Sequence, residues 1–113
     1  MLEKMGDLVS PLDVVRNGNR NLHAIDRKIV YKEGAVCFAI ESLDAPLVSP
    51  GTLRLLEFDN SEPQLEKGMH FNLHNNVWGT NFRMWYDDDT LFRFSVRFSP
   101  EMPASIKAIT NAN

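Results

Sequence analysis

Residues 92–98 read FRFSVRF, so every second side chain from Phe92 to Phe98 is apolar and those between them are Arg or Ser. Successive side chains of a β-strand point to opposite faces of the sheet. The alternation therefore predicts a strand with one face on an apolar core and the other toward water. This is the clearest pattern in the chain, and it favours a fold built mainly from antiparallel strands.

A tight hairpin is predicted earlier in the chain. Residues 28–32 and 35–40 have β-rich compositions and are separated by Glu33-Gly34, and such a short connection with Gly is the sequence signal of a hairpin. The other predicted elements are a strand over residues 52–58 after the Pro50-Gly51 turn, a loop over 59–68, a strand over 70–75, and a hairpin of 82–86 with 91–98 around a polar turn at 87–90. Several short strands with turn signals between them favour an antiparallel β-sandwich over an α/β fold.

The N-terminal segment has a different pattern. Four apolar side chains recur there at helical spacing, which predicts a short amphipathic helix. These residues are Leu2, Met5, Leu8 and Val9. Ser10-Pro11 would end this helix and begin a second short one that stops at residues 17–19. With 113 residues the chain has the usual size of one domain. We therefore expect a single β-sandwich domain over residues 1–98, with residues 1–20 as a short helical lead-in and residues 99–113 as a loosely ordered tail.

The charge and hydropathy of the chain limit the classes of partner and the cellular location that we expect. The formal net charge is -3 and the 12 Lys and Arg residues are scattered along the sequence, so we expect no nucleic-acid partner. The N-terminus has charges where a signal peptide needs its apolar centre, and no run of eighteen apolar residues occurs. We therefore expect no membrane span and no export signal within this chain, which places it in the cytoplasm if the chain is complete.

Cys37 is the single cysteine, so the chain cannot form an internal disulfide. Its neighbours Val36 and Phe38 indicate a buried strand position, where Cys acts as a small apolar residue. We therefore expect an unreactive thiol.

Two histidines raise the question of a metal site. His70 and His74 have the H-x-x-x-H spacing that, on a helix, lets both imidazoles reach one ion. In the predicted strand they would lie about 13 Å apart, too far for one tetrahedral site, so we predict no metal and no cofactor. A small metal-dependent enzyme is the alternative if the strand bulges or breaks. Asn72 shares their strand face, and the resulting polar row either faces solvent or contacts the hydroxyl groups of a sugar.

The acidic run 87–89 does not have the spacing of a catalytic or calcium site. A calcium loop of the EF-hand type needs oxygen ligands over about a dozen residues, and a glycosidase needs two carboxylates held apart across the scissile bond. Residues 87–89 are therefore predicted to form a solvated turn. The sequence also lacks a Gly-rich phosphate loop, a nucleophile elbow and a CxxC pair, so we expect no catalysis by the chain alone.

Residues 75–86 combine amide and aromatic side chains at high density. In a sugar site an aromatic ring covers the apolar face of the pyranose, while amides bond its hydroxyl groups. The alternative is that the two Trp residues are core aromatics and the Asn residues shape turns. The candidate substrate contacts are Asn75, Asn76, Trp78, Asn81 and Trp85, together with His70, Asn72 and His74.

Two motifs carry a resemblance to a known family. Residues 40–48 read IESLDAPLV, and residues 68–82 read GMHFNLHNNVWGTNF and are followed by Trp85-Tyr86. This sequence resembles the C-terminal end of a family of large bacterial proteins related to the α-mannosidase-like glycoside hydrolases. The resemblance spans roughly residues 10–98. His74 stands where the family commonly has Tyr, and Arg83 where it commonly has Pro.

The resemblance implies a position within a larger architecture. In the full proteins a catalytic (β/α) domain precedes β-sandwich domains, and this chain resembles the last of those. The catalytic carboxylates and metal ligands belong to the N-terminal region, so the resemblance implies a non-catalytic β-sandwich module that gives structural support and contacts carbohydrate near residues 75–85. The alternative is an assembly module that oligomerises or docks onto another chain such as a catalytic domain, because a sheet cut from a larger sandwich leaves edges and apolar surface uncovered.

Overall fold

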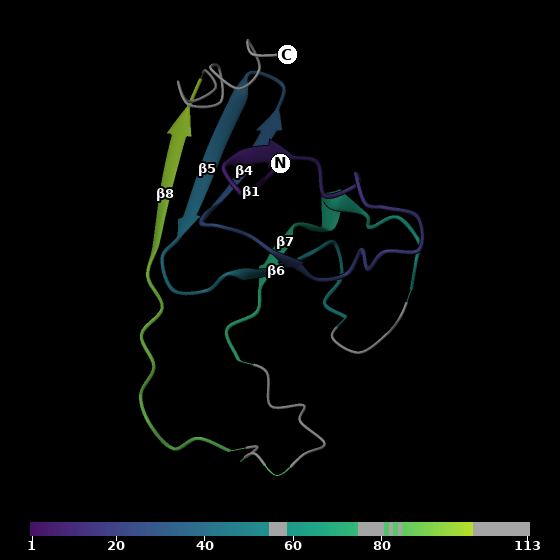
Figure 1. Cartoon of the computed structure of the whole chain (residues 1–113). Coiled ribbons are helices and arrows are strands. Elements are labelled where there is room, and N and C mark those ends of the chain that lie inside the picture. Colours follow the sequence, from purple (N-terminus) through teal and green to yellow (C-terminus); the bar gives the residue numbers. More distant parts are fainter. Residues whose placement is uncertain (55–58, 75–80, 82, 84, 101–113) are drawn as a thin grey trace.

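The computed structural model describes residues 1–54, 59–74, 81, 83 and 85–100. Within them the protein is mainly β, as predicted, and forms two antiparallel sheets (Figure 1). The larger sheet has five strands in the order β2 (Asp7–Val9), β1 (Leu2–Lys4), β4 (Lys28–Glu33), β5 (Val36–Ser42) and β8 (Phe94–Ser99). The smaller sheet has three strands in the order β3 (His23–Ala24), β6 (Leu47–Pro50) and β7 (Met69–Phe71). A turn of 3-10 helix, η1 (Leu65–Lys67), lies in the predicted loop before β7.

The predicted hairpin around Gly34 is confirmed as β4 and β5. Glu33 pairs with Val36, so the connection is the two residues Gly34-Ala35. Gly34 has a φ of 58°, the positive value that a type II′ turn requires at its first central position. Glycine adopts this conformation without the steric cost that a Cβ adds, which is why a local sequence signal was sufficient here.

The predicted N-terminal helices are wrong. Residues 2–9 form the hairpin of β1 and β2, with Leu2 opposite Val9. Its turn is Met5-Gly6, whose φ values of 53° and 86° are those of a type I′ turn. The apolar spacing that suggests a helix also suits this hairpin, because Leu2 and Val9 share one face of the sheet and Leu8 lies on the other. Residues 10–20 contain turns and no helix.

The predicted partner of the last strand is also wrong. β8 pairs with β5 over its whole length, from Cys37 opposite Ser99 to Ser42 opposite Phe94, and so forms an outer edge of the larger sheet (Figure 1). Trp85 and Tyr86, from the proposed partner strand 82–86, lie in no strand; residues 82 and 84 lie outside the described part. β5 already belongs to the sheet and offers backbone hydrogen-bonding groups along the whole length of β8.

Other predicted boundaries shift. Residues 52–54 are not in a strand, and the rest of the predicted strand, 55–58, lies outside the described residues. The strand predicted over 70–75 begins at Met69 and ends at Phe71. Ser99, placed in the tail by the sequence, is the last residue of β8, and residues 101–113 lie outside the description. No helix in the described part of the chain is long and apolar enough to cross a membrane.

Two apolar clusters lie on opposite faces of the larger sheet. The first contains residues from both sheets: Leu2, Ile25, Ile29 and Val48 are buried, and Val9, Ile40, Met69 and Phe71 pack against them. The second contains Val30, Cys37 and Ala39, with Leu8 packed against it. Cys37 is 2% exposed, which confirms its predicted buried strand position.

Candidate functional site

The apolar face of the larger sheet continues past the first cluster. Cross-strand partners share a face, and the pairing places Tyr31 opposite Phe38 and Phe38 opposite Phe98. Ile40, which packs on the first cluster, lies opposite Val96. We call the outer part of this face the apolar edge; it consists of Tyr31, Val36, Phe38, Phe94, Val96 and Phe98.

The apolar edge is largely open to solvent. Phe98 is 75% exposed, Val96 50% and Phe94 41%, although their alternation predicted the core side of a strand. Val36 at the start of β5 is 56% exposed. The two faces of the strand were therefore predicted correctly, although β8 begins at Phe94 and not at residue 91. The burial of the apolar face was not, because the described residues leave Val36, Val96 and Phe98 largely exposed.

Aromatic contacts organise the apolar edge. The ring centroids of Tyr31 and Phe38 are 5.1 Å apart, and those of Phe38 and Phe98 are 5.8 Å apart. Phe94 meets Phe71 of β7 edge to face at 4.9 Å, so the start of β8 contacts the smaller sheet. These separations lie within the range of favourable aromatic pairs. The rings are thus held in place while their outer surfaces face water.

An ion pair fixes the entry into β8. The backbone N–H and the Nε of Arg93 donate to Oδ2 of Asp44 at 2.8 and 2.9 Å, and its Nη2 donates to Oδ1 at 2.9 Å. Hydrogen bonding from the Arg93 side chain, and then from its backbone, lowers the pKa of Asp44 to about 2. Asp44 lies just after β5 and Arg93 just before β8, so the pair joins these neighbouring strands at one end.

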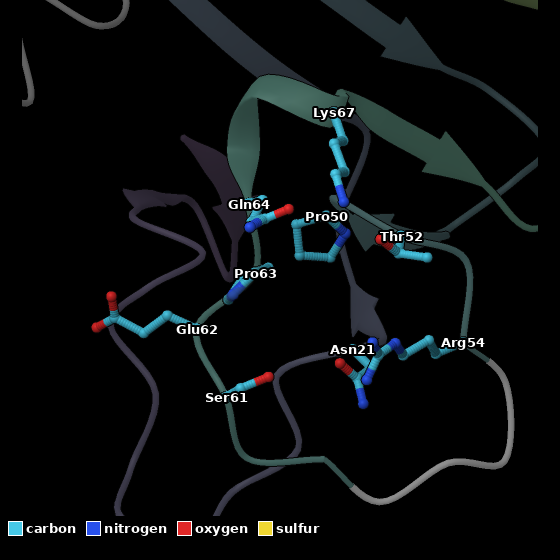
Figure 2. Close-up of a pocket in the computed structure, with 9 residues that line it drawn as sticks. All are labelled: Asn21, Pro50, Thr52, Arg54, Ser61, Glu62, Pro63, Gln64 and Lys67. Carbon is cyan, nitrogen blue, oxygen red and sulfur yellow. The ribbon is translucent and has the colours of Figure 1, made fainter.

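A polar pocket lies beside the smaller sheet (Figure 2). It has a volume of about 280 Å³ and is lined by Asn21, Pro50, Thr52, Arg54, Ser61, Glu62, Pro63, Gln64 and Lys67. In Figure 2 the Arg54 side chain extends toward Asn21, whereas the Glu62 carboxylate points away from the other lining groups. Such a pocket can hydrogen-bond a small polar molecule, but no aromatic ring is among these lining residues. From the sequence, Pro50 was marked only as part of a turn signal and residues 61–67 only as part of a loop, so no pocket was predicted here.

Local contacts shape this pocket. Asn21 Nδ2 donates to the Asp59 carbonyl at 3.3 Å, and Arg54 forms an ion pair with the Asp59 carboxylate. The pKa of Asp59 is lowered, chiefly by the hydrogen bond that its carboxylate accepts from the backbone N–H of Ser61. Gly51 has a φ of 77°, and a Cβ there would lie 3.0 Å from the Gln64 carbonyl oxygen. Glycine at this position therefore lets the loop approach the end of β6.

The three candidates of the polar row have separate environments. His70 in β7 bonds through Nε2 to the Gly51 carbonyl at 2.7 Å. Asn72 follows the end of β7; its backbone N–H donates to the Leu47 carbonyl at 3.0 Å, and its buried Nδ2 has no hydrogen-bond partner among the described residues. His74 is exposed and packs edge-on against Phe92 at 5.3 Å. Because β7 ends at Phe71, they do not form a continuous strand face.

The described residues contain no group of three or more His, Cys, Asp or Glu side chains arranged to hold a metal ion. Of the other candidates, Asn81 is exposed and Trp85 and Tyr86 are each 72% exposed. Trp85 is therefore not a core aromatic. Asn75, Asn76 and Trp78 lie outside the described residues.

Sequence reasoning passed over His23, which is 4% exposed. Its Nδ1 accepts a hydrogen bond from Lys4 Nζ at 3.0 Å, and its Nε2–H donates to the Arg20 carbonyl at 3.2 Å. Burial, and then the charge of Lys4, lowers the pKa of His23. β3 has two residues, too few for a periodic signal, and no spacing motif marks this histidine.

A scan against family models, a search of curated proteins and a search of solved structures each found no match to this chain.

Proposed function

We propose that this chain is a non-catalytic structural module that docks onto another polypeptide through its apolar edge, within an assembly like the glycoside-hydrolase-related proteins that its sequence resembles. The observation that carries the proposal is the exposure of Phe94, Val96 and Phe98, at 41%, 50% and 75%, on one face of β8. Contiguous exposed apolar surface of this kind commonly marks an interaction site.

The proposed architecture is a β-sandwich with one layer incomplete. Val48 of the smaller sheet packs with Leu2 and Ile29 of the larger sheet in one cluster, which supports packing of the two sheets face to face. The strands around β8 extend past that cluster. A docked partner would continue the larger sheet beyond β8 or pack on this extension.

The energetic gain of such docking is substantial. Full burial of a Val or Phe side chain stabilises by about 1.5–3 kcal/mol relative to full exposure, and the rings of the apolar edge are already positioned by their mutual contacts. The preordered rings lower the entropy cost of association. A partner that contacts the edge would therefore gain affinity mainly from Phe98, the most exposed of the three β8 side chains.

The experiment combines light scattering with binding of the apolar-surface dye 8-anilinonaphthalene-1-sulfonate. We expect the chain either to self-associate or to remain a monomer that binds the dye. In the second case the dye fluorescence should be lower with Phe98→Ser and with Val36→Ser than with the unmodified chain. Leu53→Ser is the matched control, because Leu53 is 58% exposed and lies outside the apolar edge; it should leave both readouts unchanged. A monomer that binds no dye would contradict the proposal.

A second candidate function is carbohydrate contact, favoured by the exposure of Trp85 and Tyr86, 72% each. Exposed rings of this kind can stack on the apolar face of a sugar. The test is an NMR titration of the labelled chain with mono- and oligosaccharides, including mannosides, that follows the Trp85 indole signal. A saturable shift that Trp85→Ala removes and Tyr86→Phe retains would support it, and an unchanged indole signal across the panel would argue against it.

A further inference from the structure

We propose that the partner of the apolar edge is a second copy of this chain, added edge to edge along β8 in antiparallel register with Val96 opposite Val96 of the second copy. This inference rests on the proposed docking function and names its partner. It follows from three features of β8: the direction of its free backbone groups, the register that satisfies them, and the side chains which that register brings together.

The first step identifies the backbone groups that face the open edge. The Leu43 N–H donates to the Arg93 carbonyl at 3.1 Å, so these opposed residues form a hydrogen-bonded pair. Hydrogen-bonded and non-hydrogen-bonded pairs alternate along antiparallel strands. Ser95 and Arg97 therefore direct their backbone groups toward β5, and the even-numbered residues between and beside them direct theirs outward.

The other side of β5 agrees with this assignment. The Ser42 N–H donates to the Arg27 carbonyl at 2.7 Å, on the side of β4. Odd-numbered residues of β5 consequently face β8 and even-numbered ones face β4. Because β8 is the last strand of the sheet, the outward backbone groups of Phe94, Val96 and Phe98 have no neighbouring strand among the described residues.

The second step is the register. An added antiparallel strand must place outward-facing residues opposite outward-facing residues. Two copies of β8 meet this condition for all three residues when Val96 lies opposite Val96, and Phe94 of each copy lies opposite Phe98 of the other. This arrangement has a twofold axis at Val96, as expected of a closed homodimer. Each of the three pairs can then exchange two backbone hydrogen bonds.

The third step concerns the side chains in this register. Cross-strand partners share a face, so the apolar edges of the two copies form one continuous apolar surface. On the opposite face Arg97 of each copy lies opposite Ser95 of the other, which avoids a like-charge pair. A shift that places Val96 opposite Phe98 would put Arg97 opposite Arg97, and a one-residue shift would move apolar side chains against polar ones.

β8 also lacks the common protection of an edge strand. Edge strands are often protected by Pro, bulges or charges on the exposed apolar side. β8 contains no Pro, its pairing with β5 is continuous, and its charged residue Arg97 lies opposite Ala39, on the face away from the apolar edge. Within the part of the chain that the structure describes, the outward backbone groups of Phe94, Val96 and Phe98 are therefore accessible to an added strand.

The first experiment measures molar mass by light scattering and analytical ultracentrifugation over a concentration series. We expect a dimer that dissociates on dilution. Val96→Lys should weaken the dimer at least tenfold, because it places two charges at the twofold axis. Val36→Lys is the matched control: Val36 is 56% and Val96 50% exposed, and both belong to the apolar edge, but Val36 is not on β8. Far-UV circular dichroism checks that both variants fold.

The second experiment tests the register without weakening the strand. Hydrogen-bonded antiparallel partners have Cα atoms about 5.5 Å apart, which a disulfide can span. Val96→Cys should therefore form a covalent dimer under mild oxidation. Ser99→Cys should not, because Ser99 lies opposite Arg93 in this register. The unmodified chain is a further control, since its Cys37 is 2% exposed.

The outcomes separate this inference from the function on which it rests. A dimer that Val96→Lys dissociates and Val96→Cys traps supports the inference. A dimer trapped by Ser99→Cys instead, or one that only Val36→Lys dissociates, overturns the register. A monomer at every concentration that binds the dye, with a signal that Phe98→Ser lowers, overturns the second copy but retains docking. A monomer that binds no dye overturns both.

Discussion

Lys4 in β1 donates a hydrogen bond to Nδ1 of His23 in β3 across 3.0 Å, and the contact joins the larger sheet to the smaller one. Lys is only a donor, so Nδ1 must be the acceptor and the His23 ring is neutral with its proton on Nε2. That proton is directed at the Arg20 carbonyl, 3.2 Å away. A second proton on the ring would face the Lys4 ammonium.

The free energy of unfolding should therefore fall as the pH falls below 6.5. Burial and the Lys4 charge lower the pKa of His23 in the folded chain from 6.5, so the unfolded chain takes up the proton first. The contribution of the neutral His23 ring to the free energy of unfolding is complete above pH 6.5 and is lost as the pH falls toward the lowered pKa. Urea unfolding as a function of pH measures it. His23→Gln should flatten the dependence, and Lys4→Met should raise the pKa of His23 in an NMR titration; an unchanged pKa would contradict the assignment.

A second pH prediction concerns Asp44. Hydrogen bonding from Arg93 lowers its pKa from 3.8 to about 2, so the ion pair stabilises the folded chain above pH 3.8 and is lost as the pH falls from 3.8 to about 2. The backbone amide of Arg93 donates to Asp44, and its NMR shift should report this protonation. Asp44→Asn should abolish the transition. A titration midpoint at 3.8, the ordinary pKa of an Asp side chain, would show that the ion pair does not persist in solution.

Met5→Asn should raise the free energy of unfolding by about 1 kcal/mol. Met5 has a φ of 53°, a conformation that costs most side chains about 1–2 kcal/mol and that Asn adopts more readily. Met5 is 95% exposed, so the substitution removes little packing. Chemical denaturation at one fixed protein concentration measures the change, with Met5→Ala as a control that keeps the unfavourable backbone. In a helix Asn would instead lower stability, so a decrease would restore the helical interpretation.

Leu2→Ala should lower the free energy of unfolding by about 2–5 kcal/mol, the usual cost of truncating a buried Leu. Leu2 is 0% exposed and lies in the cluster with Ile29 and Val48. The matched substitution Leu53→Ala, at a side chain 58% exposed, should change stability by no more than about 0.5 kcal/mol. Equal effects of the two substitutions would mean that the N-terminal hairpin does not contribute to the core in solution.

The prediction of the N-terminal segment failed for a specific physical reason. Leu2, Leu8 and Val9 have a spacing compatible with a helix, but also with two short strands around Met5-Gly6. Burial decides between the two, because the hairpin places Leu2 and Val9 against the first cluster and Leu8 against the second. Those contacts involve residues as distant as Val48, and no local pattern contains them.

The candidate site was likewise predicted in part from residue types, while the fold decided the surroundings of its residues. The sequence marked Trp85 and Asn81 by residue type, and the structure places both at the surface. Spacing drew attention to His70 and His74, for which no metal site was predicted, whereas the buried histidine with an altered pKa is His23. A spacing motif describes neighbours along the chain, but the environment of His23 is made by Lys4 and Arg20, brought together by the fold.

The sequence by itself determined that the chain is mainly β, that residues 28–40 hold a hairpin turning at Gly34, and that residues 94–98 lie in a strand with one apolar face. These properties follow from side-chain alternation and backbone freedom, which are local. Only the tertiary structure decided that β8 pairs with β5 and that its apolar face stays open. Both depend on segments far apart in the sequence, such as the pairing of β5 with β8, the cluster that contains Leu2 and Val48, and the ring contact of Phe71 with Phe94.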